Sequence, residues 1–198
     1  LIDADIKGPG KAVGPYFDET PLKDSLGATL QELQLDGDVN ARLHLDIPLN
    51  GELVTAKGEV TLRNNSLFIK PLDSTLKNLS GKFSFINGDL QSEPLTASWF
   101  NQPLNVDFST KEGAKAYQVA VNLNGNWQPA KTGVLPEAVN EALSGSVAWD
   151  GKVGIDLPYH AGATYNVELN GDLKNVSSHL PSPLAKPAGE PLPVNVKV

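Results

Sequence analysis

The side chains that could perform acid–base or metal chemistry are few and widely separated. The chain has three histidines, His44, His160 and His179, and none has a second histidine or a carboxylate at a spacing typical of a metal site. His44 alternates with Arg42 and Asp46 on the polar side of a predicted strand, which indicates a solvated surface group. The sequence contains neither a Gly-x-Ser-x-Gly nucleophile motif nor a phosphate-binding glycine loop. We therefore expect no enzymatic activity, no catalytic residue, no metal and no cofactor.

The composition excludes further classes of function. The 198 residues include 16 Lys plus Arg against 23 Asp plus Glu, for a net charge of -7, and the basic residues are scattered singly. A chain with this charge is expected to bind nucleic acid or an anionic membrane surface poorly, because it lacks a cluster of basic residues. A hydrophobic fraction of 40% and a charged fraction of 20% are typical of a globular chain. Cysteine is absent, which excludes disulfides and thiolate metal sites.

Alternation of apolar and polar residues dominates the chain and predicts β-strands. Residues 33–53 carry apolar or small side chains at odd positions and mostly polar ones at even positions. A straight strand of that length would span about 70 Å, so we expect a turn at residues 48–51, after which the apolar parity flips through residues 54–62. The same period of two recurs at residues 83–85, 119–123, 153–157 and 165–169. The pattern indicates a mostly antiparallel β protein.

Turn signals predict two hairpins, because Asn-Gly and Asp-Gly tolerate the positive φ of two-residue loops. They are Asn87-Gly88 and Asp150-Gly151, the second joining residues 147–149 to 152–157.

Helices are expected in two places. Thr20 as N-cap, followed by leucines at helical spacing as far as Leu33, predicts one short amphipathic helix. Residues 136–143 predict a second.

A short pattern of Leu, any residue, Gly, a polar residue and an apolar residue recurs unevenly. It begins at Leu35, Leu49, Leu79, Leu123, Leu143 and Leu169. The spacings vary too much for a solenoid, so we interpret the glycines as bends or bulges in strands. The alternative is that glycine marks turns, as it does in any β protein.

The aromatic residues allow two interpretations. Trp99, Phe100, Trp127 and Trp149 could form a contact surface for sugar or lipid, or they could be ordinary core residues at strand parity.

One continuous apolar face also allows two functions. If the face closes against a second sheet, it is a structural core. If the sheet curls into an open trough, acyl chains can lie along it and gain about 0.8 kcal/mol per CH₂ against water. A 16-carbon chain gains on the order of 10 kcal/mol against water but almost nothing between two bilayers, which suits a conduit. Alternation alone does not choose between the core and the trough.

Two segments resemble a known family. Residues 169–187 contain Leu180-Pro181-Ser182-Pro183-Leu184-Ala185-Lys186, which resembles the Leu-Pro-x-Pro-Leu-x-Lys segment of the AsmA-like envelope proteins, and residues 35–49 are similar to the same family. The resemblance implies a long curled β-sheet that acts as a bridge-like lipid transfer protein. Such a protein is anchored in the inner membrane of Gram-negative bacteria and crosses the periplasm, and phospholipids move along its groove.

From the residues and the resemblance together, we expect an elongated, curled, taco-like antiparallel sheet with an open hydrophobic groove and a few short helices. Residues 1–198 would be one continuous groove segment, an interior fragment of a much longer periplasmic protein. It would shield phospholipid acyl chains during transfer from the inner to the outer membrane. The positions expected to line the groove are Val39, Leu43, Leu45, Ile47, Val60, Leu62, Phe83, Phe85, Val119, Val121, Val153, Ile155, Val167 and Leu169.

The expected partners are phospholipids and the rest of the chain at both ends of the sheet. The inner membrane would be reached through an anchor outside this segment, and outer-membrane or periplasmic proteins are further candidates. Two alternatives stay open. One is a structural or protein-interaction β module with a closed core. The other is a hydrolase, which would need two carboxylates converging across a cleft that no spacing here predicts.

Overall fold

Strands make up most of the regular structure in the computed structural model, which describes residues 1–12, 33–48 and 53–198. The first eight strands are β1 (Ile2–Pro9), β2 (Leu33–Asp36), β3 (Asp38–Asp46), β4 (Thr55–Ile69), β5 (Ser74–Ile86), β6 (Asp89–Ser92), β7 (Leu95–Trp99) and β8 (Gln102–Glu112). The others are β9 (Ala116–Trp127), β10 (Leu143–Gly145), β11 (Val147–Pro158), β12 (Thr164–Asp172), β13 (Val176–Ser178) and β14 (Pro193–Lys197). The helical elements are α3 (Glu137–Ala142) and the 3-10 turns η1 (Gly10–Ala12), η3 (Lys70–Leu72), η4 (Pro129–Lys131) and η5 (Leu173–Asn175).

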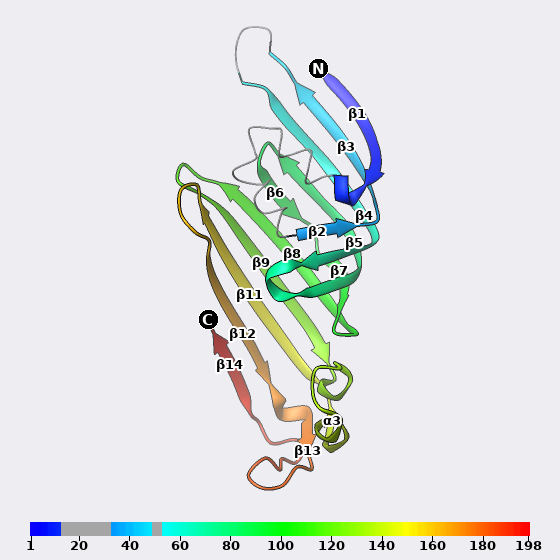
Figure 1. The fold of residues 1–198 in the computed structure, drawn as a ribbon, viewed down its shortest axis with the longest axis vertical. Coiled ribbons are helices and arrows are strands. Elements are labelled where there is room, and N and C mark those ends of the chain that lie inside the picture. Colours follow the sequence, from blue (N-terminus) through cyan, green and yellow to red (C-terminus); the bar gives the residue numbers. More distant parts are fainter. Residues whose placement is uncertain (13–32, 49–52) are drawn as a thin grey trace.

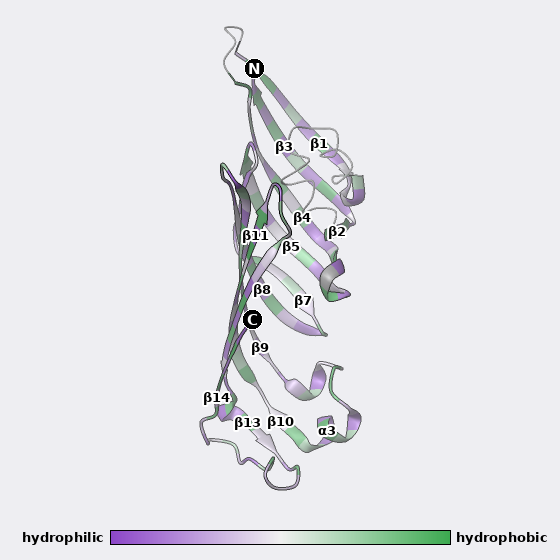
Figure 2. Ribbon diagram, turned by 60° about the vertical axis from the view of Figure 1, so that its left-hand side comes forward, coloured by the Kyte–Doolittle hydropathy of each residue, from purple (hydrophilic) through white to green (hydrophobic). Residues whose placement is uncertain are grey.

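Twelve of the described strands form one antiparallel sheet. Its order is β1-β3-β4-β5-β6-β8-β9-β11-β12-β14, with β2 beside β4 and with β7 beside both β5 and β8. The sheet is long and curled (Figure 1). When the strands β8 to β14 are seen nearly edge-on, η3 and α3 both project to the same side of them (Figure 2). The predicted mainly β fold, a curled antiparallel sheet with a few short helices, is therefore confirmed.

A bend in the long strands β4 and β5 lets the sheet pack against itself. The β4–β5 register shifts between Leu62 and Asn65, and Asn64, Asn78 and Gly81 have positive φ angles of 55°, 54° and 136°. Asn65 is 1% exposed, and its Nδ2 donates to the carbonyls of Asp36 and Asp38 at 3.0 and 3.1 Å. This buried amide stabilises the break between β2 and β3 beside the bend.

The residues around the bend form one buried cluster, which we call the closed core. It consists of Val39, Leu62, Leu76, Leu79, Leu95, Ala97, Leu104 and Val106, each at most 8% exposed. Leu35, Leu67 and Ile69, from the far side of the bend, pack against it. The apolar side of the sheet is thus covered in this region.

One of the two predicted hairpins is confirmed and the other is wrong. Asn87 has a φ of 52° and joins β5 to β6 as expected. Asp150 and Gly151 instead lie inside β11, which continues from Val147 to Pro158 and pairs with β9 and β12 on its two sides. A Cβ at position 151 would stand 2.7 Å from Cδ2 of Leu169, so the glycine leaves space that this side chain occupies and does not mark a turn.

The glycines of the recurring pattern divide into two kinds. Gly37, Gly81 and Gly145 have φ angles of 93°, 136° and 94°, and Gly37 and Gly145 stand directly beside strand ends. For these three the prediction of bends is confirmed. For Gly125 and Gly171 it is wrong, because both lie inside continuous strands, opposite Trp149 on β11. The pattern starting at Leu49 falls partly outside the described residues.

The predicted helix at residues 136–143 is confirmed as α3, with Pro136 at its N-cap. The helix predicted from Thr20 lies outside the described residues, and Leu33, its last apolar position, begins β2. The turn expected at residues 48–51 also lies largely outside them. The flipped parity after that turn is confirmed, because Ala56, Gly58, Val60 and Leu62 are paired with the odd positions of β3. None of the described helices has the length and apolar character to cross a membrane.

A second, two-stranded sheet of β10 and β13 lies beside α3 at one end of the large sheet (Figure 1). The segment 180–186 follows β13 and is anchored to that strand. Lys186 Nζ donates to the carbonyls of Val176 and Pro187 at 2.9 and 3.1 Å, and Lys186 forms a bridge with Ser178. The Leu-Pro-x-Pro-Leu-x-Lys segment therefore belongs to this end structure.

Candidate functional site

Thirteen of the fourteen positions expected to line a groove lie on one face of the large sheet. Directly paired residues on neighbouring strands share a face. Ile47 is the exception, since it follows the end of β3 and is 41% exposed. The pairs that place the rest together are Val39 with Leu62, Phe83 with Val60, Leu43 and Phe85 with Gly58, Leu45 with Ala56, Val121 and Val167 with Val153, Val119 with Ile155, and Leu169 with Gly151. Phe83 contacts Phe108, which is paired with Val121, so the two halves present the same face.

These thirteen residues differ in exposure. Val39 and Leu62 are 7% and 4% exposed and belong to the closed core. The other eleven are partly exposed, and several of them pack at the border of that core. The apolar side of the sheet is therefore closed in one region and accessible in another.

The accessible region follows β8, β9, β11, β12 and β14, and we call it the open face. It consists of three successive rows of paired residues. Val106 is buried, and all the other large side chains in these rows are partly or fully exposed. The rows are Val106-Leu123-Gly151-Leu169-Val196, Phe108-Val121-Val153-Val167 and Thr110-Val119-Ile155-Tyr165. No charged side chain occupies a paired position in these rows.

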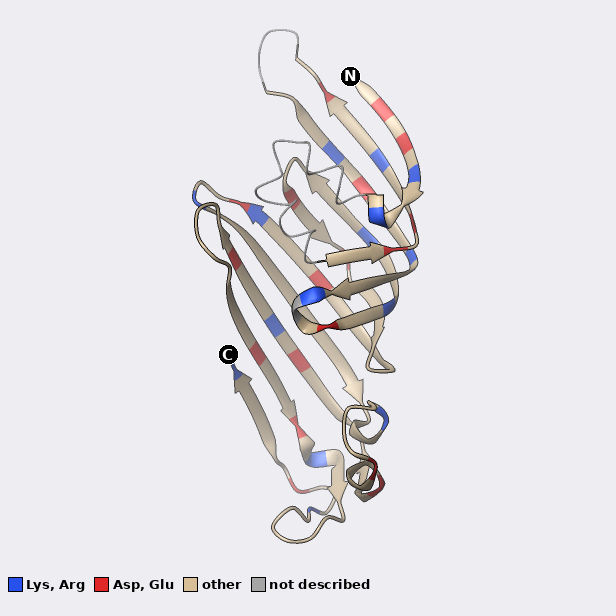
Figure 3. Ribbon diagram, viewed as in Figure 1, with Lys and Arg blue, Asp and Glu red and all other residues tan. Residues whose placement is uncertain are grey.

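The opposite face of the same strands is polar and hydrogen-bonded. Asn122 Nδ2 donates to Asp107 at 2.7 Å, and Gln118 Nε2 donates to Asp156 at 2.8 Å. A further cross-strand row joins Asn105 to Asn124 at 3.0 Å. Charged residues are spaced singly along these strands (Figure 3). Such cross-strand pairs stabilise a sheet by roughly 0.2–1 kcal/mol each, so the polar face holds the strands in register without help from a second layer.

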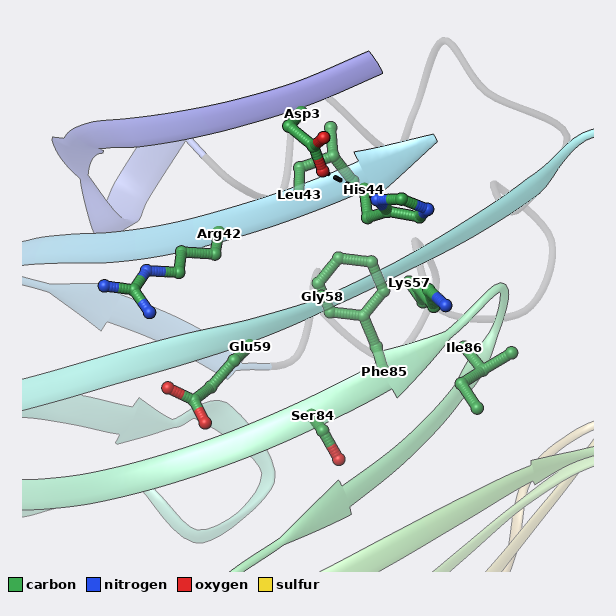
Figure 4. A pocket seen from close by; sticks show the side chains of 10 residues that line it. All are labelled: Asp3, Arg42, Leu43, His44, Lys57, Gly58, Glu59, Ser84, Phe85 and Ile86. Atoms are coloured by element: carbon green, nitrogen blue, oxygen red, sulfur yellow. Dashed lines mark hydrogen bonds and ion pairs between the residues drawn. The ribbon is translucent and has the colours of Figure 1, made fainter. Parts of the chain in front are cut away.

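A pocket of about 410 Å³ lies on the polar face of the first strands. Its rim is formed by two rows of side chains that are polar except for Ile86, and the backbone of Gly58 lies at its floor (Figure 4). His44 Nδ1 is 2.6 Å from Oδ1 of Asp3 on β1, and Arg42 Nε is 3.5 Å from Asp5. The pairing of β1 with β3 supplies these partners, which spacing within β3 could not indicate.

This pocket offers little chemistry. No group of three or more metal-ligating side chains was found in the described part of the chain. The pocket is open, and the Arg42 and Asp5 side chains are 83% and 86% exposed, so their charges are screened by solvent. We therefore look to the apolar face for the functional site.

Four aromatic residues from separate parts of the chain meet on the apolar face, and we call them the aromatic cluster. They are Trp99, Phe100, Trp127 and Trp149. The rings of Trp127 and Trp149 are 4.8 Å apart at 74°, and Trp99 stacks on Phe100 at 4.8 Å and 29°. Trp99 and Trp127 are 6.1 Å apart at 75°. All three indoles pack against the closed core.

The aromatic cluster lies where the closed core meets the open face. On β7 and β8 it adjoins the uncharged pairs Ala97-Leu104 and Trp99-Gln102. On β9 to β14 it occupies the uncharged rows Gly125-Trp149-Gly171-Val194 and Trp127-Val147, the first of which directly follows the Leu123 row of the open face. Strand parity allowed the three tryptophans to be core residues, but Phe100 follows Trp99 directly and lies in the turn after β7. The fold, and not parity, brings the four residues together.

A buried tyrosine marks the other end of β9. Tyr117 is 0% exposed, and its hydroxyl donates to the carbonyl of Gly88 at 2.8 Å and lies 2.7 Å from Thr110 Oγ1. Burial raises the pKa of Tyr117 to about 12. The hydroxyl is therefore neutral at ordinary pH, and it ties β9 to the Asn87-Gly88 turn.

Asp89 stabilises the same corner through its charge. Burial of the carboxyl disfavours ionisation, but the backbone N–H of Glu112 at 2.7 Å and the ammonium of Lys111 outweigh that effect and lower the pKa of Asp89 below its ordinary value. The corner between β6, β8 and β9 is thus held by one neutral and one ionised group.

Comparison with known proteins gives a consistent result. A family model described as "YhdP protein" matches residues 1–198. A curated protein of Escherichia coli (strain K12), "Intermembrane phospholipid transporter YhdP", is 98% identical over 198 residues. The match covers all of this chain and 16% of that relative's length. No solved structure matches the chain. The resemblance to the AsmA-like proteins, and within them to YhdP, is confirmed.

Proposed function

Because the chain belongs to the YhdP family, we propose that it forms a segment of a conduit that shields phospholipid acyl chains as they cross the periplasm between the inner and outer membranes. The name of the Escherichia coli relative, an intermembrane phospholipid transporter, supports phospholipid as the cargo. The chain spans 16% of that relative's length, so anchoring in the inner membrane and any contact with outer-membrane or periplasmic proteins would involve other segments.

The observation that carries this proposal is the uncharged, accessible open face. Its large apolar side chains beyond Val106 remain partly or fully exposed, and none of its paired positions carries a charge. Burying apolar surface stabilises a protein by about 25 cal/mol per Å², so a folded sheet that leaves such a surface uncovered forgoes stability unless something else covers it. An acyl chain covers it without requiring any directional contact.

The groove, in this proposal, is lined by the eleven partly exposed positions among the fourteen expected ones. Val39 and Leu62 would support it from the closed core. Residues 1–198 would form one continuous segment, joined to the rest of the sheet at its edge strands β1 and β14. Phospholipid shielding requires no reacting group, so we propose that the segment is not an enzyme and that its residues act by solvation alone.

Photocrosslinking in the full-length protein in cells tests the proposal. A benzophenone side chain is placed at Leu43, Leu45 or Val153 on the apolar face, and at the adjacent positions Arg42, His44 or Lys152 on the polar face. Covalent adducts are then isolated and identified by mass. We expect phospholipid adducts at the apolar positions and few at their polar neighbours.

The rival function is a protein-interaction module with a closed core. It predicts protein adducts alone, or adducts at neither set of positions. Equal capture of lipid at both sets would also overturn the proposal, because it would indicate non-specific contact with a membrane surface.

A further inference from the structure

The aromatic cluster combines unfavourable features that a purely structural core would avoid. The first is the backbone of Phe100. Phe100 and Asn101 form the two-residue turn between β7 and β8 with φ angles of 48° and 60°. Asparagine and glycine are the usual residues in that region, and a bulky residue there is strained. Phe100 is nevertheless 37% exposed, and its ring stacks on Trp99.

The second unfavourable feature is the indole N–H of Trp149. Trp99 Nε1 donates to Ser74 Oγ and Trp127 Nε1 donates to the carbonyl of Pro103, each at 2.7 Å. Trp149 Nε1 is buried and has no hydrogen-bond acceptor among the described residues. A buried donor without an acceptor destabilises the folded state, because the N–H group has lost its hydrogen bond to water. Two strained or unsatisfied groups in one cluster indicate that its arrangement serves more than stability.

Glycines beneath the cluster make room for the rings on the sheet surface. Gly125 and Gly171 are paired with Trp149 on its two sides. A Cβ at position 125 would stand 2.7 Å from Nε1 of Trp127, and one at 151 would stand 3.3 Å from Cζ3 of Trp149. Aromatic rings that lie over glycines cover the sheet without narrowing the space above it.

The chemistry of the cluster selects one kind of ligand. Two indole N–H groups are engaged within the protein and the third is buried, so the rings offer little to the hydroxyl groups of a sugar. The rows that hold the cluster have no charged side chain to pair with a phosphate or an ammonium group. Ring faces and edges without polar partners suit the methylene groups of an acyl chain.

We propose that the aromatic cluster is an acyl-chain contact site at the boundary of the open face, where chains leaving the open face lie against Phe100, Trp127 and Trp149. This inference rests on the proposed function. It adds a site that none of the fourteen groove positions includes, and it identifies the strained Phe100 turn as the element that holds the exposed ring over the path.

The test uses benzophenone crosslinking in the full-length protein. Benzophenone is itself aromatic, so it replaces an aromatic side chain of the cluster with a similar group. It is introduced at Phe100 or Trp127, at the polar-face neighbours Asn126 and Ala148, and at Val153 as a reference for the open face. We expect phospholipid adducts at 100 and 127 at least about five-fold above those at 126 and 148.

A second variant separates contact from folding. Phe100→Asn places a turn-compatible residue at the strained position, so hydrogen exchange of the β7–β8 hairpin should be unchanged or slower. Phospholipid capture at position 127 should nevertheless fall about three-fold or more. Faster exchange in this variant would show that Phe100 has a structural role alone and would overturn the inference.

The outcomes distinguish this inference from the proposed function. Adducts at 153 but not at 100 or 127 would overturn the aromatic site and leave the conduit in place. Adducts at 126 or 148 equal to those at 127 would overturn the aromatic site as well. No phospholipid adduct at any of the three apolar-face positions would overturn both proposals.

Discussion

The ring of Phe85 lies over the bare backbone of Gly58 on the neighbouring strand (Figure 4). A Cβ at position 58 would stand 2.7 Å from Cζ of Phe85 and 2.2 Å from the carbonyl oxygen of Arg42. Gly58 is also paired with Leu43, so the row Leu43-Gly58-Phe85 carries two large side chains across three strands. The missing side chain at Gly58 therefore leaves room for the ring of Phe85 on the apolar face. Gly125 and Gly171 leave room beside Trp149 in the same way.

The first prediction concerns this packing. Gly58→Ala should destabilise strands β3 to β5 by about 1–3 kcal/mol, because neither the carbonyl of Arg42 nor the ring of Phe85 can move away without disturbing its strand. Hydrogen exchange of peptides from β3 to β5 measures the effect in the full-length protein. Gly154→Ala is the matched control, since the nearest atoms to a Cβ there are 4.0 Å away. Equal acceleration of exchange by both substitutions would contradict the explanation.

The second prediction concerns alkaline pH. Tyrosine ionises near pH 10 in an unfolded chain, whereas burial raises the pKa of Tyr117 to about 12 in the folded protein. The free energy of unfolding should thus be unaffected by this group below pH 10 and should fall by up to about 3 kcal/mol between pH 10 and pH 12. Urea unfolding followed by tryptophan fluorescence measures it. In Tyr117→Phe this decline should be largely absent, and an unchanged decline would show that another group causes it.

The third prediction concerns acidic pH. The lowered pKa of Asp89 means that its ionised carboxylate stabilises the folded state above roughly pH 4, the ordinary value for aspartate, and that this contribution disappears as the pH falls through the lower folded pKa. Because the pair with Lys111 is partly exposed, the contribution should be only about 0.5–1 kcal/mol. Urea unfolding between pH 2 and pH 6 tests this. Asp89→Asn should flatten the acidic part of the profile, and a profile as steep as the original would contradict the assignment.

The local sequence predicted one hairpin correctly and one wrongly, and the failure of the second has a physical reason. Asn87-Gly88 and Asp150-Gly151 carry the same turn signal, but only Asn87 adopts a positive φ. At 150–151 the strand continues because β9 and β12 supply hydrogen-bonded partners on both sides, and because Leu169 fills the space that a side chain at 151 would need. Tertiary pairing overrides a dipeptide preference, and no single-strand pattern contains that information.

The aromatic cluster shows a similar limit. Alternation placed Trp127 and Trp149 on apolar parity, but their contact depends on the register between β9 and β11, which the chain connects through α3. A usable signal was present in the recurring pattern, because its copies at Leu123 and Leu169 supply the glycines on either side of Trp149. In this pattern Gly125 and Gly171 make room for an aromatic ring, whereas Gly37, Gly81 and Gly145 form bends.

The last prediction tests whether the open face must stay uncharged. Val119 is partly exposed between Thr110 and Ile155, so Val119→Glu should fold, yet it places a carboxylate where acyl chains would lie. If an acyl chain loses the apolar contact of only two methylene groups at this carboxylate, it loses about 1.6 kcal/mol of stabilisation. Transfer of labelled phospholipid between membranes by the full-length protein should therefore slow about ten-fold or more. Ala120→Glu adds the same charge one residue away on the polar face and should leave the rate nearly unchanged. If both variants slowed transfer equally, with hydrogen exchange of β9 unaltered, net charge and not the open face would control the rate.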